Sequence, residues 1–339
     1  MKKTGWGFIG ASNIAREYML AAVRSQPGQE VVAVASRSAE RARAFAQEHG
    51  IATACDSVAA LLADPAVDAV YVSSTNDQHC EQVLAAAAAG KHVLCEKPLA
   101  MSVADAKRMV QACRAQGVVM ATNHHLRNAA THRRMRDLVQ SGAVGRPLFA
   151  RVFHAVYLRP VVQGWRINRP EAGGGVIFDI VVHDVDALRF ILGTEPVEAT
   201  GMSQNAFLSQ QGVEDGAMAI LRFDDGLLAQ VHAAFTVRHA QTGLEIHGSE
   251  GSIVARDVMT AKPIGEVLLR NAEGERLVEV EHVGLYEGAV ARFVAAMRGE
   301  GEPAASGEDG VRSLAATIAV LDACRSGRAC RIGVDATVG

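Results

Sequence analysis

The sequence lacks the features that mark membrane, exported and disulfide-stabilised proteins. Its longest strongly apolar run, residues 83–89, is far shorter than the roughly 20 residues that span a bilayer. The apolar stretch after Lys2 and Lys3 is short, contains glycine and precedes no small-residue cleavage site, so we expect no export signal. The six cysteines include no C-x-x-C pair. We therefore expect reduced thiols in a cytoplasmic protein without a membrane partner.

The chain also lacks a large excess of positive or negative charge. The chain has 34 Lys and Arg against 37 Asp and Glu, for a net charge of −3, and no long basic run. Proteins that track nucleic-acid phosphates need a basic surface, so the composition argues against a nucleic-acid partner. Apolar residues make up 49% of the 339 positions, enough for two buried cores.

Short apolar runs alternate with amphipathic stretches in the first third of the chain, a pattern typical of parallel strands joined by helices. We predict an α/β Rossmann domain over residues 1–122, with a parallel sheet, and an α+β domain over residues 123–339, with a large, mainly antiparallel open sheet. The apolar runs predict strands at 6–9, 31–35, 69–72, 92–95 and 118–121. Helices predicted near the end, at 287–297 and 310–324, are expected to pack back on the first domain.

The first predicted strand leads into a turn that resembles a dinucleotide-binding fingerprint. Gly10 and Ala15 occupy the first and third glycine positions of that motif, and Ser12 replaces the second. Such a turn presents backbone N–H groups to a pyrophosphate at a helix N-terminus. The alternative is an ordinary strand-to-helix turn without a ligand.

The end of the second strand favours NADP(H) over NAD(H). NAD-specific folds place an acid here to bind the ribose 2′-hydroxyl, whereas this chain has Ser36 and Arg37, with Arg41 one turn later. Cations and a hydroxyl suit a 2′-phosphate. The alternative is that both arginines are simply solvated.

Two further segments carry candidates for catalysis. Lys97 follows a predicted buried strand, and Pro98 restricts it to extended backbone geometry. Asp179 and His183 are four residues apart, so on a helix they share one face as an acid/base pair. The alternatives are that Asp179 caps a helix while His183 packs in an interface, or that the two are metal ligands. A metal would need a third ligand, which His124, His125, His154 or Asp184 could supply, and we expect no metal.

Polar and aromatic residues elsewhere suit the same site. Trp165 and Arg166 suit a wall of a polyol pocket, or alternatively anchor a domain interface. Thr75 and Asn76 follow the third predicted strand at the expected cofactor edge, and Asn123 follows the last strand.

Four motifs in this order resemble the glucose–fructose oxidoreductase/inositol dehydrogenase/MocA family. They are the Gly10-Ala-Ser turn, Asn76-Asp-Gln-His79, Glu96-Lys97-Pro98, and Gly173-Gly-Gly with Asp179 and His183. The resemblance covers nearly the whole chain. Within the family, Asn123-His-His-Leu-Arg-Asn128 and Gln163-Gly-Trp-Arg166 resemble one branch more specifically and imply reduction of a sugar C2 ketone by NADPH.

The resemblance implies roles for individual residues. Ser36 and Arg41 contact the 2′-phosphate, Lys97 and His183 flank the reacting carbon, and Asp179 binds substrate hydroxyls. Trp165, Arg166 and His154 are further candidates for substrate binding. The candidate cofactor-binding residues are Gly10, Ser12, Asn13, Ile14, Ser36, Arg37, Arg41, Thr75, Asn76, His79, Glu96, Lys97, Asn123, Trp165 and Arg166.

The expected reaction is an NADP-dependent oxidoreduction of a small sugar. Alternatives are a dehydrogenase of another polyol or ketose, of the inositol or dihydrodiol type, a glycosidase that cycles bound NAD(H), and a non-catalytic NADP-binding regulator. Members of the family form dimers or tetramers through the open face of this sheet, and a homodimer through the second-domain sheet is one of the assemblies that the resemblance implies here.

Overall fold

The computed structural model describes residues 3–209 and 212–333. It divides into two compact units. The first unit extends to His124 and also contains Tyr286–Val311, and the second contains His125–Leu285 and the residues from Arg312 onward. The chain therefore returns to the first unit late in the sequence before it ends in the second.

The first unit is built on a parallel sheet of six strands in the order β3-β2-β1-β4-β5-β6. Every residue of β4 is buried, as a strand covered on both faces must be. The strand order reverses between β1 and β4, which is where open sheets of this kind bind ligands. The strands are β1 (Thr4–Ile9), β2 (Gln29–Ala35), β3 (Thr53–Cys55), β4 (Ala69–Val72), β5 (His92–Cys95) and β6 (Met120–Thr122).

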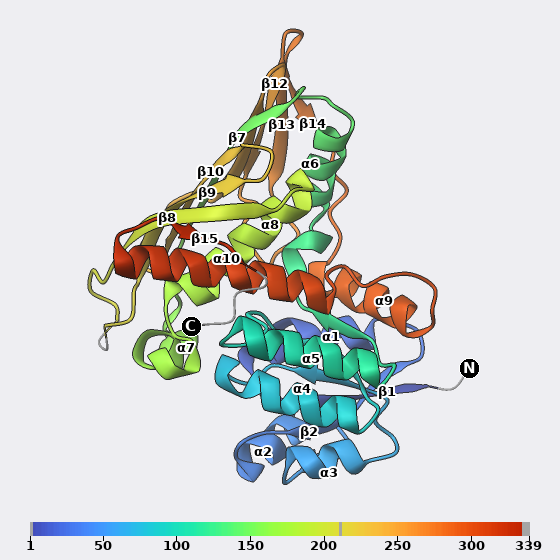
Figure 1. The fold of residues 1–339 in the computed structure, drawn as a ribbon. Helices are drawn as coiled ribbons and strands as arrows, with labels where there is room; N and C mark the ends of the chain where they lie inside the picture. The colour runs from blue at the N-terminus through green and yellow to red at the C-terminus, as the bar shows by residue number, and fades with distance from the viewer. Residues whose placement is uncertain (1–2, 210–211, 334–339) are drawn as a thin grey trace. The chain divides into compact units, whose positions relative to one another are not determined.

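Helices connect these strands, and serine side chains start three of them. The Oγ atoms of Ser38, Ser57 and Ser102 each accept a hydrogen bond from the backbone N–H three residues later. Helices α4 and α5 lie side by side on the sheet (Figure 1). The helical segments are η1 (Ala15–Met19), α1 (Leu20–Arg24), α2 (Ala39–His49), α3 (Val58–Ala63), η2 (Asn76–Gln78), α4 (His79–Ala88), α5 (Val103–Ala115) and α9 (Leu285–Met297).

The second unit contains a sheet of nine strands in the order β14-β13-β12-β11-β7-β10-β9-β8-β15. All neighbours are antiparallel except β7 and β10. Along β9, Ala219 and Leu221 are buried whereas Met218 and Ile220 are about half exposed, so one face packs and the other is open. The strands are β7 (Pro147–Ala155), β8 (Pro196–Gln204), β9 (Gly216–Phe223), β10 (Leu228–Ala234), β11 (Gly243–Gly248), β12 (Gly251–Arg256), β13 (Glu266–Asn271), β14 (Gly274–Val278) and β15 (Cys330–Arg331).

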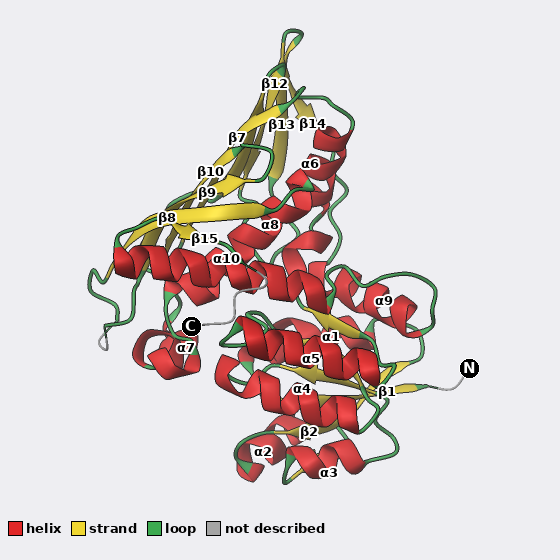
Figure 2. Ribbon diagram, in the orientation of Figure 1, coloured by secondary structure: helices red, strands yellow, loops and turns green. Residues whose placement is uncertain are grey.

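The packed face of this sheet carries α6 and α8 (Figure 2). The predicted fold class is therefore confirmed: a parallel Rossmann sheet followed by a mainly antiparallel one. The helical segments of the second part are η3 (His125–Asn128), α6 (Ala130–Gln140), α7 (Pro160–Asn168), η4 (Pro170–Ala172), η5 (Ile177–Val181), α8 (Val182–Leu192) and α10 (Gly307–Ser326).

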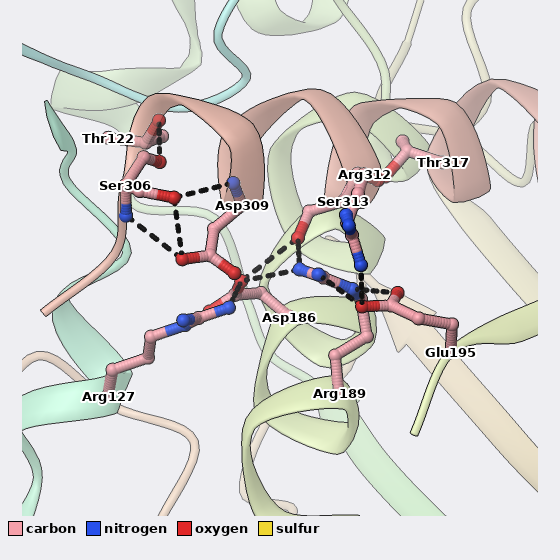
Figure 3. A network of polar contacts seen from close by, with 10 residues as sticks. All are labelled: Thr122, Arg127, Asp186, Arg189, Glu195, Ser306, Asp309, Arg312, Ser313 and Thr317. Atoms are coloured by element: carbon pink, nitrogen blue, oxygen red, sulfur yellow. Dashed lines mark hydrogen bonds and ion pairs between the residues drawn. The ribbon is translucent and has the colours of Figure 1, made fainter. Parts of the chain in front are cut away.

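A buried ion-pair network fixes α8 in the second unit (Figure 3). Asp186 accepts two hydrogen bonds from Arg127, Nε to Oδ2 and Nη2 to Oδ1, both at 2.8 Å. Ser313 Oγ on α10 donates to Asp186 Oδ1 at 2.9 Å and accepts from Arg189 Nη1 at 2.9 Å. Arg189 also makes a two-pronged pair with Glu195. Since each buried charge has partners, the network holds α8 against η3 and α10.

All six cysteines carry free thiols, as their spacing predicts. No helix in the described parts of the chain is long and apolar enough to cross a membrane.

Candidate active site

The predicted cofactor-binding residues of the first unit all lie at one edge of its sheet. Gly10 follows β1, Ser36 follows β2, Thr75 follows β4, Glu96 follows β5 and Asn123 follows β6. Because the strands are parallel, their carboxyl ends share this edge. The structure thus brings together residues that are up to 113 positions apart, from Gly10 to Asn123.

The turn after β1 has the shape that a nucleotide-binding turn requires. Gly10 has φ of +115°, and a Cβ there would lie 2.8 Å from the carbonyl carbon of Ser73, so only glycine fits. Ser12 Oγ accepts from the N–H of Ala15 at 3.1 Å and donates to Ser73 Oγ at 2.8 Å. The hydroxyl that replaces the usual glycine therefore fastens the start of the helix, where Asn13 and Ile14 lie. Backbone N–H groups at a helix start of this kind suit a pyrophosphate.

Positive charge without acidic partners lies at the end of β2. Arg37 and Arg41 are exposed, and neither forms an ion pair with any residue that the structure describes. Arg41 Nη2 donates to the carbonyl oxygen of Ala11 at 3.3 Å, so its guanidinium links α2 to the turn after β1. Together with the Gly10 turn, this arrangement fits a dinucleotide that carries a 2′-phosphate.

The residue before Lys97, Glu96, has a buried carboxyl group. Glu96 Oε1 accepts hydrogen bonds from Tyr71 Oη at 2.7 Å and from Asn123 Nδ2 at 2.6 Å. Burial raises the pKa of Glu96, although both hydrogen bonds and the charge of Lys97 oppose this shift. Lys97 is half-buried, and its peptide bond to Pro98 is cis. Glu96 therefore anchors the backbone from which the Lys97 side chain extends.

His79 connects the loops after β4 and β5 from within the protein. Its ring is fully buried, with Nδ1 3.0 Å from the carbonyl oxygen of Pro98 and Nε2 3.4 Å from that of Ser74. Burial lowers the pKa of His79. The ring thus supports the loops that carry Lys97 and Asn76.

The second unit holds the remaining predicted residues in two groups. In the first, Arg166 Nε donates to Asp179 Oδ2 at 3.2 Å, and its guanidinium lies 4.7 Å from the centre of the Trp165 ring. In the second, the His183 ring centre lies 6.4 Å from that of His154 and 4.8 Å from that of His125.

The structure also reveals a carboxylate–imidazole pair that the sequence did not indicate. His154 Nδ1 lies 2.7 Å from Oδ1 of Asp184, which is fully buried. The sequence had suggested Asp179 as the carboxylate beside a histidine, whereas Asp179 is bonded to Arg166. Residues 154 and 184 are 30 positions apart, and no spacing rule connects them.

A second unpredicted residue, Glu214, explains the last of the three glycines before Asp179. Gly175 has φ of +113°, and a Cβ there would lie 2.2 Å from Glu214 Oε1. Glu214 accepts from Val176 N–H at 3.0 Å through its carbonyl and from Ile177 N–H at 3.2 Å through Oε1. Burial raises the pKa of Glu214. This side chain therefore caps the start of η5, which carries Asp179.

The first unit provides a sheet edge suited to a nucleotide, with Lys97 beside it. The second unit provides His183, Asp179 and Trp165, side chains of the kinds that bind sugar hydroxyl groups. Among the residues that the structure describes, no three His, Cys, Asp or Glu side chains gather as a metal site would require. These are the components of a nicotinamide-dependent oxidoreductase that acts on a polyol or sugar.

Comparison with known proteins identifies the family. Residues 4–124 match the oxidoreductase family with an NAD-binding Rossmann fold, GFO/IDH/MocA, and residues 132–254 match the GFO/IDH/MocA C-terminal domain. The chain is 58% identical over 327 residues to 1,5-anhydro-D-fructose reductase of Ensifer adhaerens, covering 96% of this chain and 98% of that protein. It is 29% identical over 286 residues to myo-inositol 2-dehydrogenase of Thermotoga maritima, covering 81% and 83%.

A solved structure shows the same fold. Aldose-aldose oxidoreductase from Caulobacter crescentus, crystallised with glycerol, superimposes with a TM-score of 0.88 at 25% identity, covering 97% of this chain and 100% of that one. The chain therefore belongs to the GFO/IDH/MocA family of NAD(P)-binding oxidoreductases, and the predicted family and enzyme class are confirmed.

Proposed function

We propose that this enzyme uses NADPH to reduce the C2 ketone of 1,5-anhydro-D-fructose, giving 1,5-anhydro-D-mannitol. The 58% identity to the reductase of Ensifer adhaerens, over nearly the full length of both chains, is the observation that carries this proposal. The preference for NADPH is supported by Arg37, just after β2 where NAD-specific folds carry an acid, and by Arg41 on α2. Neither has an acidic partner among the described residues.

Each candidate residue has a task in this reaction. Bound NADPH supplies a hydride to the carbonyl carbon, so negative charge develops on the carbonyl oxygen. The ammonium of Lys97 stabilises this charge, and His183 donates the proton that completes the alcohol. Asp179 accepts hydrogen bonds from sugar hydroxyls. Arg166 holds that carboxylate in place and presents its guanidinium beside the Trp165 face.

The proposed test compares substrates and cofactors with purified protein. Loss of NADPH absorbance is followed with 1,5-anhydro-D-fructose and with a panel of aldoses, ketoses and inositols, and the series is repeated with NADH. We expect turnover of the anhydro sugar, with NADPH well above NADH. Turnover of another sugar alone would contradict the substrate, and silence on all of them would favour a non-catalytic regulator.

We also propose that the protein is cytoplasmic and forms a homodimer through the open face of the nine-stranded sheet. This proposal is supported by large apolar side chains on that face: Phe149, Met218 and Ile220 are each about half exposed. Light scattering of the purified enzyme is expected to give twice the mass of the chain. Met218→Glu is expected to yield the monomer, and a monomeric wild-type protein would refute the proposal.

A further inference from the structure

The pair formed by Asp184 and His154 has a geometry that determines which ring nitrogen carries hydrogen. Asp184 is fully buried, and its Oδ1 lies 2.7 Å from Nδ1 of His154. The oxygens of an ionised carboxyl group only accept hydrogen bonds, so a contact this short requires a hydrogen on the ring nitrogen. The ring must therefore carry a hydrogen on Nδ1, whether it is neutral or protonated. Nε2 is the remaining nitrogen.

His154 lies on a central strand of the second unit, close to His183. His154 lies on β7, a strand held on both sides by β10 and β11, so its backbone has little freedom. Its ring centre is 6.4 Å from that of His183, the proposed proton donor, and the residue keeps 7% of its surface exposed. The buried ring thus lies beside one of the residues proposed to act on the sugar.

We propose that Asp184 is a positioning residue that fixes the orientation and tautomer of His154, so that Nε2 serves as the hydrogen-bonding atom for a sugar hydroxyl. With Nδ1 held by Asp184, Nε2 is the ring nitrogen left to hydrogen-bond that hydroxyl. This inference deepens the proposed function and rests on it for the identity of the ligand, a polyhydroxylated sugar. The hydrogen on Nδ1 is inferred from the geometry alone.

Asp186 provides a matched control on the same helix. It is also buried, with 1% of its surface exposed, but its partners are Arg127 and Ser313 rather than a histidine. Asp184→Asn and Asp186→Asn therefore make the same chemical change in two buried positions of α8. Only the first is expected to alter a histidine tautomer.

The first experiment reads the ring directly by NMR of protein labelled with ¹⁵N-histidine. The His154 resonances are identified by their loss in His154→Gln. We expect hydrogen on Nδ1 in the wild type, a change of tautomer population in Asp184→Asn, and no change in Asp186→Asn. A wild-type ring with hydrogen only on Nε2 would overturn the proposal, and this result needs no variant other than His154→Gln, which serves only for the assignment.

The second experiment measures steady-state kinetics with the sugar and with NADPH. Loss of the group that orients a functional histidine costs about tenfold or more in activity. We expect Asp184→Asn to raise the KM for sugar about tenfold with the KM for NADPH unchanged. The double variant with His154→Gln should be no worse than His154→Gln alone, because the two residues act as a unit.

The outcomes separate this inference from the proposed function. Additive losses in the double variant, or an equal rise in sugar KM in Asp186→Asn, would refute a positioning role for Asp184. If wild-type protein reduces no sugar, the proposed function fails, while the NMR result still decides how Asp184 holds His154.

Discussion

Selectivity for NADPH is expected to depend on two arginines at the end of β2. Arg37 and Arg41 are exposed and have no acidic partner among the described residues, so both are available to a 2′-phosphate. A hydrogen bond to a charged group contributes about 1.5–3 kcal/mol, and exposure to solvent places these two at the low end of that range. Since 1.4 kcal/mol corresponds to a factor of ten, each alanine variant should lower kcat/KM for NADPH about tenfold. The double variant should lower it about a hundredfold.

The assay is kcat/KM for NADPH and for NADH with the same sugar, because only NADPH carries the 2′-phosphate. We expect NADH values within about twofold of wild type in Arg37→Ala, and a slightly larger loss in Arg41→Ala, because Arg41 also bonds Ala11. Arg43→Ala is the matched control, an exposed arginine on the same helix. Parallel losses with both cofactors, or an unchanged ratio in the double variant, would refute the assignment.

Three further predictions concern chemistry, stability and pH. Lys97→Met and His183→Ala should each lower kcat by orders of magnitude without weakening NADPH binding, measured by fluorescence titration, because each is proposed to act on the carbonyl oxygen. Asp186→Ala should cost about 3–5 kcal/mol of unfolding free energy in urea titrations, since it leaves two buried arginines without their shared carboxylate. Burial lowers the pKa of His132 to about 4, so the unfolded chain binds this proton more readily than the folded one. Stability should therefore fall between about pH 6.5 and pH 4, and His132→Asn should make this decline shallower.

The sequence predicts the first unit well because its signals are local. Continuous apolar runs predict β1, β2, β4 and β5, since strands buried on both faces carry few polar residues. The prediction for the last strand of this sheet, 118–121, begins two residues before β6 (Met120–Thr122) and ends one residue before it. Strand β3 has only three residues at the edge of the sheet, too few for any pattern to register.

The cofactor edge could be anticipated for a related reason. In a parallel sheet, the residues that follow the strands all lie at the same edge. Locating the strand ends in the sequence therefore also identifies residues that lie near one another in the fold. Lys97, Ser36 and Asn76 follow from this rule without knowledge of their side-chain contacts. The rule does not reach Tyr71, which lies within β4 yet donates a hydrogen bond to Glu96.

The side-chain contacts of the second unit could not be predicted from the sequence, because they join residues that are far apart in the chain. Glu214 caps η5 from a loop 37 residues further along the chain, and an isolated glutamate before a strand carries no signal of that task. The triple glycine did carry a signal, since it implied a close approach, but it could not name the approaching group. Gly175 is therefore the test of this reasoning: Gly175→Ala places a methyl group against Glu214 in a left-handed backbone, and it should disturb η5 and Asp179 while the Rossmann unit keeps its NADPH affinity.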